Sequence, residues 1–582
     1  MTQGFDSWFE IEKGVLIRYR GRDAEVTVPD GITAVGDGAF GYCRSVRRVT
    51  LPDSVRRVGG RAFHKCGGLE AVRLPEALED LGDEAFSGCA RLREIDVPAG
   101  ITRIGEKAFY HCLRLTDVRL PGGLRSVGAR AFKACRSLKS ISVPDSVTGI
   151  GEEAFAYCER LETLSAGNTA SVGYRAFYAC AGLKEVSLLR GTIEIGPEAF
   201  GDCTGLVSFR AGDDLRFIGD RAFLRCVSLE DLSLGASLER LGRGVFRDCA
   251  RLNGVVLPEA LKEMGEGVFC GCGALAAIDI PRGVTVIPAR AFRGCGSLTR
   301  AALPDTVTDI GDEAFRACAG LEEFTVPDSV RYLGSGVFEY CGGLKKAQIP
   351  DGVGRVGDRL FRYCKLLERV RLPKGMTRIP GGMFETCMSL TRITIPAGVK
   401  SIGPSSFDGC GRLEDAGLPE GLETIGSHAF CRCGLKRLVI PDTVTDIGEA
   451  AFYFCAGLED VSLPGGLKKI GRFVFADCLK LKNVAIPDAV GSIGECAFLY
   501  SGLESVRIPD GVTSVGTDAF ERCGRLESVI LPDSVTELKR GAFRECPKLK
   551  NVSLPESLRD AAGEAFAGCL KASIRYRPTN AK

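Results

Sequence analysis

Cysteine is the residue type with the most chemical potential in this chain, which has 26 cysteines among its 582 residues. Twenty-three of them stand three residues after a phenylalanine that recurs along the chain, from Cys43 and Cys66 to Cys546 and Cys569. Regularly spaced cysteines can form disulfides, bind metal ions or fill a core as free thiols. The geometry of the repeat decides between these roles.

That geometry argues against disulfides. If each copy forms one coil of a stack, equivalent cysteines lie about 4.8 Å apart and point in parallel. A disulfide needs Cβ atoms about 3.5–4.5 Å apart. One copy replaces the cysteine with Ser501, which is also small and forms hydrogen bonds. We therefore predict an inward-facing ladder of free thiols that donate to turn carbonyls.

A metal site has one candidate set, His428, Cys431 and Cys433. Cys433 belongs to the ladder and is expected to point inward. No second Cys-x-x-Cys or histidine pair stands nearby to complete four ligands. The other histidines, His64 and His111, lie on different repeats. We expect no metal site and no cofactor.

Catalytic motifs are absent from the sequence. It contains no Walker-type phosphate loop, dinucleotide fingerprint, nucleophile elbow or His-Glu-x-x-His. The repeats differ in length by three single-residue deletions alone, so no loop leaves the scaffold to build an active site. We predict that the chain is not an enzyme and assign no catalytic residues.

The recurring phenylalanine occurs 24 times, at steps of 23 residues except for three steps of 22. Residues 304–326 are a clean copy of the unit Pro-x-x-Val-x-x-Ile-Gly-x-x-Ala-Phe-x-x-Cys-x-x-Leu-x-x-Val-x-Leu. Leu-x-x-Val-x-Leu predicts a strand buried on one face, ended by proline. Gly-x-x-Ala-Phe-x-x-Cys predicts a helix of one to two turns. Pro288 and Pro380 replace the glycine in two copies, so that position is not expected to need a left-handed backbone.

This unit resembles the BspA-like (Treponema-type) class of leucine-rich repeats, over about residues 5–578. The resemblance implies an α/β, mainly β fold: a curved, right-handed solenoid of about 24 repeats of 22–23 residues, with a parallel concave sheet and short helical turns. Known members are often bacterial or protist surface proteins that attach to host or matrix proteins or to other cells. The resemblance therefore implies an adhesin-like role.

The ends of the chain and one internal zone depart from the repeat. Residues 9–19 predict a hairpin that turns at Lys13-Gly14 and, with Trp8, caps the first repeat. The last strand, 573–576, carries arginines that blunt an open edge. We divide the chain into a capping hairpin (1–28), one continuous solenoid (29–578) and a tail (579–582). In the zone around 160–236 the strand-end proline is replaced by Gly167, Leu189, Gly212 and Gly235. Either the curvature of the solenoid changes in this zone or the sequence has drifted there without a structural role.

Charge and hydropathy limit partners and location. The 76 basic and 74 acidic residues lack the basic excess of a nucleic-acid-binding domain. No apolar run reaches the ~18 residues of a membrane span, and residues 1–6 lack the basic start of a secretory signal. We expect no nucleic-acid partner, no membrane insertion and a cytoplasmic location. The resemblance implies a secreted or cell-surface protein as the alternative.

The exposed strand positions that flank the central valine map a candidate binding face. From the twelfth repeat onward they carry several basic residues, interrupted or bordered by Asp279, Glu323 and Asp415. This pattern predicts a weakly basic concave patch for an acidic partner surface, with a merely solvated strand face as the alternative. The patch comprises Arg300, Lys346, Arg369, Arg371, Arg392 and Arg437.

Aromatic residues gather one or two positions after the repeat phenylalanine. Stacked repeats would place such residues side by side along one flank, either as a lateral contact surface or as partial cover for the turn. The candidate flank aromatics are Tyr340, Tyr363, Tyr453 and Phe454.

The sequence favours a macromolecular recognition module that binds a protein, or a surface glycoconjugate, through an extended solenoid face. The alternative is an intracellular structural scaffold without catalytic activity. The identity of the partner and the oligomeric state stay open.

Overall fold

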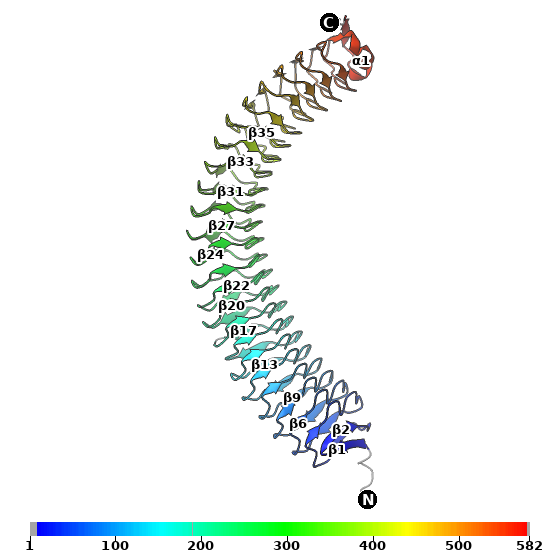
Figure 1. Ribbon diagram of the computed structural model, residues 1–582, viewed down its shortest axis with the longest axis vertical. Coiled ribbons are helices and arrows are strands. Elements are labelled where there is room, and N and C mark those ends of the chain that lie inside the picture. The colour runs from blue at the N-terminus through cyan, green and yellow to red at the C-terminus, as the bar shows by residue number, and fades with distance from the viewer. Residues whose placement is uncertain (1–7, 189, 579–582) are drawn as a thin grey trace. The chain divides into compact units, whose positions relative to one another are not determined.

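The computed structural model describes residues 8–188 and 190–578, so Leu189 of the irregular zone and the predicted tail lie outside the described residues. The chain divides into two compact units, Met1–Thr306 and Val307–Lys582. Each unit is a stack of parallel coils built on the same repeat, and the fold is a mostly β parallel solenoid of about 24 turns (Figure 1). The predicted fold class is thereby confirmed. The single continuous solenoid over 29–578 stays a prediction.

Most coils carry one strand of two to five residues and a second strand of two residues after the position of the strand-end proline. The outward surface of the longer strands is called the strand face. In the first unit these strands are β3 (Glu25–Thr27), β5 (Arg48–Thr50), β7 (Ala71–Arg73), β9 (Glu94–Asp96), β11 (Asp117–Arg119), β13 (Ser140–Val143), β15 (Thr163–Ala166), β17 (Glu185–Leu188), β19 (Ser208–Ala211), β21 (Asp231–Ser233), β24 (Ala277–Asp279) and β26 (Arg300–Ala302). In the second unit they are β28 (Glu323–Thr325), β30 (Lys346–Gln348), β32 (Arg369–Arg371), β36 (Arg437–Val439), β38 (Asp460–Ser462), β40 (Asn483–Val484), β42 (Ser505–Arg507), β44 (Ser528–Ile530), β46 (Asn551–Pro555) and β47 (Ser573–Arg577).

The shorter, two-residue strands pair in parallel and form a second series of sheets, of four to eight strands each. In the first unit they are β4 (Ala34–Val35), β6 (Arg57–Val58), β8 (Asp80–Leu81), β10 (Arg103–Ile104), β12 (Ser126–Val127), β14 (Gly149–Ile150), β16 (Ser171–Val172), β18 (Glu194–Ile195), β20 (Phe217–Ile218), β22 (Arg240–Leu241), β23 (Glu263–Met264) and β25 (Val286–Ile287). In the second unit they are β27 (Asp309–Ile310), β29 (Tyr332–Leu333), β31 (Arg355–Val356), β33 (Arg378–Ile379), β34 (Ser401–Ile402), β35 (Thr424–Ile425), β37 (Asp446–Ile447), β39 (Lys469–Ile470), β41 (Ser492–Ile493), β43 (Ser514–Val515) and β45 (Glu537–Leu538).

Equivalent residues of successive coils lie side by side in both series of sheets. In β9 and β11, Ile95 is the partner of Val118, and in β10 and β12, Ile104 is the partner of Val127. All four of these side chains are buried. The one-residue alternation of the longer strands therefore turns the valine position inward and leaves two outward positions per coil.

The third side of each coil is a series of turns and not the predicted short helix. In the coil that contains Phe86, the amide of Cys89 donates to the carbonyl of Phe86 at 3.1 Å, whereas the amide of Phe86 donates to Ala108 of the next coil at 2.8 Å. A helix would use these amides internally. Because the next coil takes alternate amides, a third parallel ladder forms in place of a helix. Helical residues within 8–188 and 190–578 are confined to Trp8, a 3-10 turn (Glu556–Leu558) and α1 (Arg559–Ala565).

This turn series places two residues per coil in the left-handed backbone region. In the Phe86 coil they are Glu84 (φ 58°) and Gly88 (φ 78°). Most coils have non-glycine residues at both positions. Such residues are seldom β-branched, because a β-branched side chain is especially unfavourable in this region, and Thr386 (φ 62°) is the exception among the described residues. The repeat glycine itself, such as Gly82, is not left-handed, as predicted. A Cβ at Gly82 would lie 2.5 Å from the backbone nitrogen of Gly60, so close approach to the preceding coil explains this glycine.

The core is a stack of phenylalanine rings with a parallel line of thiols. The rings of Phe63 and Phe86 are parallel to within 3°, with centroids 4.9 Å apart, and both are fully buried. Cys66 Sγ donates to the carbonyl of Phe40 in the preceding coil at 2.8 Å, and the same bond recurs along both units. All 26 cysteines are free, which confirms the predicted inward ladder.

At the amino-terminal end, the predicted hairpin is confirmed. Strands β1 (Phe9–Glu12) and β2 (Val15–Tyr19) are antiparallel and turn at Lys13 and Gly14, which have φ of 48° and 76°. The ring of Tyr19 lies 5.2 Å from that of Phe40 and ends the phenylalanine stack. Trp8 is 45% exposed, so the prediction that Trp8 caps the core was wrong.

At the other end, β47 pairs in parallel with β46 and places Arg575 beside Ser553. The predicted arginine-bearing last strand is therefore present. Helix α1 buries Ala562 and Ala565 beside it.

The irregular zone contains the four-residue strands β15, β17 and β19 of a regular five-stranded sheet. The amide of Gly212 donates to the carbonyl of Leu188 at 2.7 Å. Proline at this position would have no N–H to donate. Loss of the strand-end proline therefore lets the ladder extend by one residue.

The left-handed positions predict an unusual response to glycine. Ala317 has φ 59° and is half-buried, so Ala317→Gly should relieve strain and raise the free energy of unfolding by up to about 1 kcal/mol. Ala314 in the same coil is fully buried without that conformation, so Ala314→Gly should lower the free energy of unfolding by about 1 kcal/mol. Urea unfolding of both variants checks this, and equal losses would contradict it.

The thiol ladder predicts a sharp loss of stability at high pH. Burial raises the pKa of the Cys66 and Cys341 thiols to about 12. Unfolded thiols ionise near pH ~8.5. Stability should therefore be constant below that pH and fall above it, by about 1.4 kcal/mol per pH unit for each buried thiol. Urea unfolding across this range measures the slope.

The natural serine in the ladder, Ser501, suggests the matched variant for that experiment. Cys226→Ser should make the fall of the unfolding free energy with pH less steep by about 1.4 kcal/mol per pH unit, because one ionisable thiol is removed. An unfolding midpoint that does not change between neutral pH and pH ~10 would refute the account.

Candidate binding site on the strand face

Cations on the strand face are mostly neutralised by acids of a neighbouring coil. In the first unit, Arg210 and Asp231 lie 3.1 Å apart, and Arg300 and Asp279 lie 2.7 Å apart. Arg119 approaches Asp96 at 3.7 Å. Such exposed pairs add little stability, but they cancel the field of each cation locally.

The predicted basic patch contains two kinds of residue. Arg300, Lys346 and Arg371 are each held by an acid: Arg300 by Asp279, Lys346 by Glu323 at 2.8 Å, and Arg371 by Asp351 at 3.0 Å. The other three have no acid within 4 Å in the described part of the chain. These unpaired members are Arg369, Arg392 and Arg437, and all three are exposed. The binding role of the six residues stays a prediction.

The strand ladder is interrupted where the unpaired arginines lie. Between β32 and β36, which bracket a fully described stretch, the strand face has an isolated bridge from Arg392 to Asp415 in place of regular strands. Asp415 Oδ1 accepts from the amide of Gly417 at 3.0 Å, and Gly417 has φ +49°. This local turn competes with strand pairing. Ala416 also stands where most copies carry a larger inward residue.

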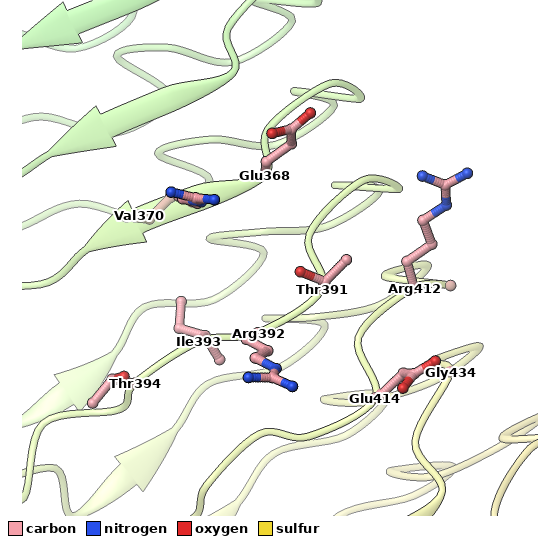
Figure 2. Close-up of a pocket in the computed structure, with 11 residues that line it drawn as sticks. Glu368, Val370, Thr391, Arg392, Ile393, Thr394, Arg412, Glu414 and Gly434 are labelled. Carbon is pink, nitrogen blue, oxygen red and sulfur yellow. The ribbon is translucent and has the colours of Figure 1, made fainter.

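A hollow of about 940 Å³ lies at this interruption (Figure 2). Arg392 and Thr391 come from one coil, and Arg412 and Glu414 from the next. Lys436 lies 2.8 Å from Glu414 and offsets its charge. The polar lining of the hollow is Glu368, Arg369, Thr391, Arg392, Thr394, Arg412 and Glu414.

A second hollow, of about 650 Å³, shares Arg392 and Glu414 with the first. It is also lined by Arg437, by the apolar residues Leu418 and Val439, and by the carboxylates of Asp415, Glu420 and Glu459. Val439 is 72% exposed, so it offers an aliphatic side chain at the surface of the hollow. The two hollows with Arg369, Arg392 and Arg437 are called the Arg392 site.

Sequence reasoning found the three arginines of this site but missed Arg412, Leu418 and Val439. The available signal was the segment Asp415-Ala416-Gly417, which replaces the usual strand residues with a turn-forming combination.

The turn side of the coils is occupied by its own contacts. The rings of Tyr340 and Tyr363 stack at 4.7 Å and 4°, side by side as expected. Arg316 lies over Tyr340 at 5.2 Å and Arg362 over Tyr363 at 5.1 Å. Both arginines also hold Glu339, which is 3% exposed. Each ring therefore packs against the other ring and against an arginine, although Tyr340 stays 41% exposed, and these contacts favour the interpretation of the tyrosines as partial cover for the turns.

The other flank aromatics pack less regularly. Tyr453 lies 6.2 Å from Phe454 and 6.2 Å from Phe473. Phe454 is 47% exposed and has φ 57°. The contacts of Tyr453 and Phe454 in the described chain do not show whether these side chains bind a partner protein.

The candidate metal ligands are used otherwise. Cys433 donates to the carbonyl of Phe407 at 3.1 Å, and His428 occupies a left-handed position with φ 56°. Over the described ranges there is no group of three or more His, Cys, Asp or Glu residues placed to hold a metal ion. Within the same ranges, none of the helices combines the length and the apolar character needed to cross a bilayer.

Comparisons with solved structures found similar repeat proteins. A leucine-rich repeat protein from Bacteroides ovatus is 20% identical, with 98% of this chain and 97% of that one covered and a TM-score of 0.34. A leucine rich cell surface protein from Faecalibacterium prausnitzii is 17% identical, with coverage of 99% and 93% and a TM-score of 0.26. A leucine rich repeat protein from T. pallidum is 20% identical, with coverage of 59% and 91% and a TM-score of 0.14.

Comparison with curated proteins gave no match. The family model for the BspA type leucine rich repeat region matches six overlapping stretches, which are residues 23–135, 102–226, 170–299, 285–414, 378–504 and 468–581. These stretches span nearly the whole chain, so the resemblance predicted from the repeat unit is confirmed. The chain belongs to the BspA-type leucine-rich repeat family.

Proposed function

We propose that this chain binds a protein partner through the strand face, with the Arg392 site at the centre of the contact, and that it does not catalyse a reaction. The observation that carries the proposal is the presence of three unpaired arginines on a face whose other cations mostly meet acids. Membership of a leucine-rich repeat family supports a recognition role.

The fold leaves the strand face as the surface most free to vary. Inward positions fill the core, and the turn residues are bound to the next coil by backbone hydrogen bonds. The two outward side chains of each coil contribute neither to the core nor to the hydrogen bonds between coils. They can therefore vary to bind a partner without destabilising the stack. A regular array of this kind offers an extended contact surface and no enclosed reaction chamber.

We further propose that this recognition is adhesin-like, as the family resemblance implies, with the partner a protein on another cell or in its matrix. A surface glycoconjugate would present anionic groups to the same arginines. Treatment of the captured material with protease or with glycosidase separates these partners: protease should destroy a protein ligand, and glycosidase should destroy a glycoconjugate.

Affinity capture with the intact chain from its native surroundings tests the proposal. Replacing Arg369, Arg392 and Arg437 together with Gln should reduce capture roughly tenfold at low ionic strength, because unpaired exposed charges steer association. The matched control replaces the paired Arg119, Arg210 and Arg300 with Gln on the same face, and capture should remain within about twofold of wild type.

Capture that persists unchanged in the Arg369, Arg392 and Arg437 variant would remove the Arg392 site from the proposal. Equal loss in both variants would show that the general charge of the strand face matters and not this site. The thermal unfolding midpoints of both variants should match wild type, since none of the six side chains is buried.

A further inference from the structure

The Arg392 site combines unpaired cations with an exposed aliphatic side chain. We infer that it holds an extended segment of the partner polypeptide in which acidic side chains stand beside one apolar side chain. This inference rests on the proposed function and makes its partner specific.

The three unpaired arginines of the site favour a carboxylate-bearing ligand, although the two hollows are also lined by Glu368, Glu414, Asp415, Glu420 and Glu459. On the rest of the face, a cation usually finds a carboxylate on a neighbouring coil, as Arg210 and Lys346 do at 3.1 and 2.8 Å. No carboxylate lies within 4 Å of Arg369, Arg392 or Arg437 in the described chain, although Asp415 and Asp460 stand beside Arg392 and Arg437 in the strand register. Arginine binds a carboxylate through two parallel hydrogen bonds. An incoming acidic side chain would therefore supply the partner that the neighbouring coil supplies elsewhere.

The spacing of the arginines fits an extended chain. Arg369 and Arg392 occupy the same position in successive coils, and Arg437 follows two coils later, so the three span about 14 Å at ~4.8 Å per coil. An extended polypeptide rises ~3.3 Å per residue, so the first and fifth residues of a segment stand about 13 Å apart on one side. Acidic residues at alternate positions can thus meet the arginines without bending the segment.

The apolar part of the site distinguishes a polypeptide from other anions. Val439 is 72% exposed and lines the second hollow with Leu418 and Pro441. A sulfated polysaccharide or a phospholipid headgroup would engage the arginines and leave these aliphatic groups without an apolar contact. An apolar side chain of a peptide would cover them, which is favourable by roughly 25 cal/mol per Å² of apolar surface removed from water.

Fluorescence anisotropy with the intact chain tests this inference. The probes are a fluorescein-labelled peptide of alternating glutamates with one central leucine (the mixed peptide), the same peptide with serine for leucine, a heparin fragment, and vesicles of phosphatidylserine in phosphatidylcholine. The mixed peptide should bind most tightly. The serine peptide should bind about fivefold more weakly, from loss of one aliphatic contact.

Two variants and one control assign the binding to the Arg392 site. Replacing Arg369, Arg392 and Arg437 with Gln should weaken binding of the mixed peptide at least about tenfold. Val439→Ser should weaken binding of the mixed peptide more than binding of the serine peptide, because it removes the apolar contact without adding a charge. The triple Gln variant at Arg119, Arg210 and Arg300 should bind the mixed peptide as wild type does. Circular dichroism establishes that each variant is folded.

Three results would overturn the inference: no binding of the mixed peptide, binding that the Arg392-site variants do not change, or tighter binding of heparin or vesicles that the same variants abolish. Failure of the proposed function is recognised separately. If partner capture is lost in the Arg369, Arg392 and Arg437 variant but the mixed peptide does not bind, recognition through the strand face stands and the acidic-apolar segment is wrong. If capture is unaffected, the proposed function fails whatever the peptide does.

Discussion

The amides of each turn segment are divided between two coils, and the rest of the structure depends on this division. Phe86 donates its amide to Ala108 of the next coil, whereas Cys89 donates back to Phe86 within its own coil. The thiol of each ladder cysteine then binds the phenylalanine carbonyl of the preceding coil, as Cys89 does with Phe63 at 3.1 Å. No coil completes its backbone hydrogen bonds or its core alone, so the repeat is stable as a stack.

This dependence leaves the outward positions of the strand face free to vary. Core positions must stay apolar, ladder positions must stay small hydrogen-bond donors, and two turn positions must tolerate a left-handed backbone. The outward strand positions carry none of these constraints, and most of their charges are satisfied within the chain. The interruption at Asp415-Ala416-Gly417 removes the strand ladder locally while the second series of sheets continues through β34 and β35. A hollow can therefore form on the strand face without breaking the stack.

Much of the fold could be predicted from the spacing of one residue. The recurring phenylalanine gave the number of coils, the alternation around valine gave the longer strands, and the constant offset of cysteine gave the thiol ladder. The turn segment was misjudged because Ala-Phe-x-x-Cys has apolar residues four apart, as a helix does. Recruitment of the amides by the next coil is a non-local effect that this pattern does not encode. Left-handed residues such as Lys107 and Tyr340 likewise have no local signal, because glycine is not required there.

The candidate site was predicted less completely. The sequence marks the arginines of the strand face, but whether each is neutralised depends on residues about 20 positions away that stacking brings close, such as Asp351 beside Arg371. The hollows form because a turn replaces a strand. Val439 belongs to the site because its side chain is exposed in the second hollow, and its exposure cannot be inferred from its own repeat. These are properties of neighbouring coils together, so a single repeat does not reveal them.

Hydrogen–deuterium exchange on the intact chain, with and without its captured protein partner, tests the central claim most directly. Residues 391–394 and 415–418 lie at the interruption of the strand ladder, so their amides should exchange quickly in the free chain. On binding, protection should concentrate in these segments and in β32 and β36. Protection confined to the turn side around Tyr340 and Tyr363, with the strand face unchanged, would contradict the account.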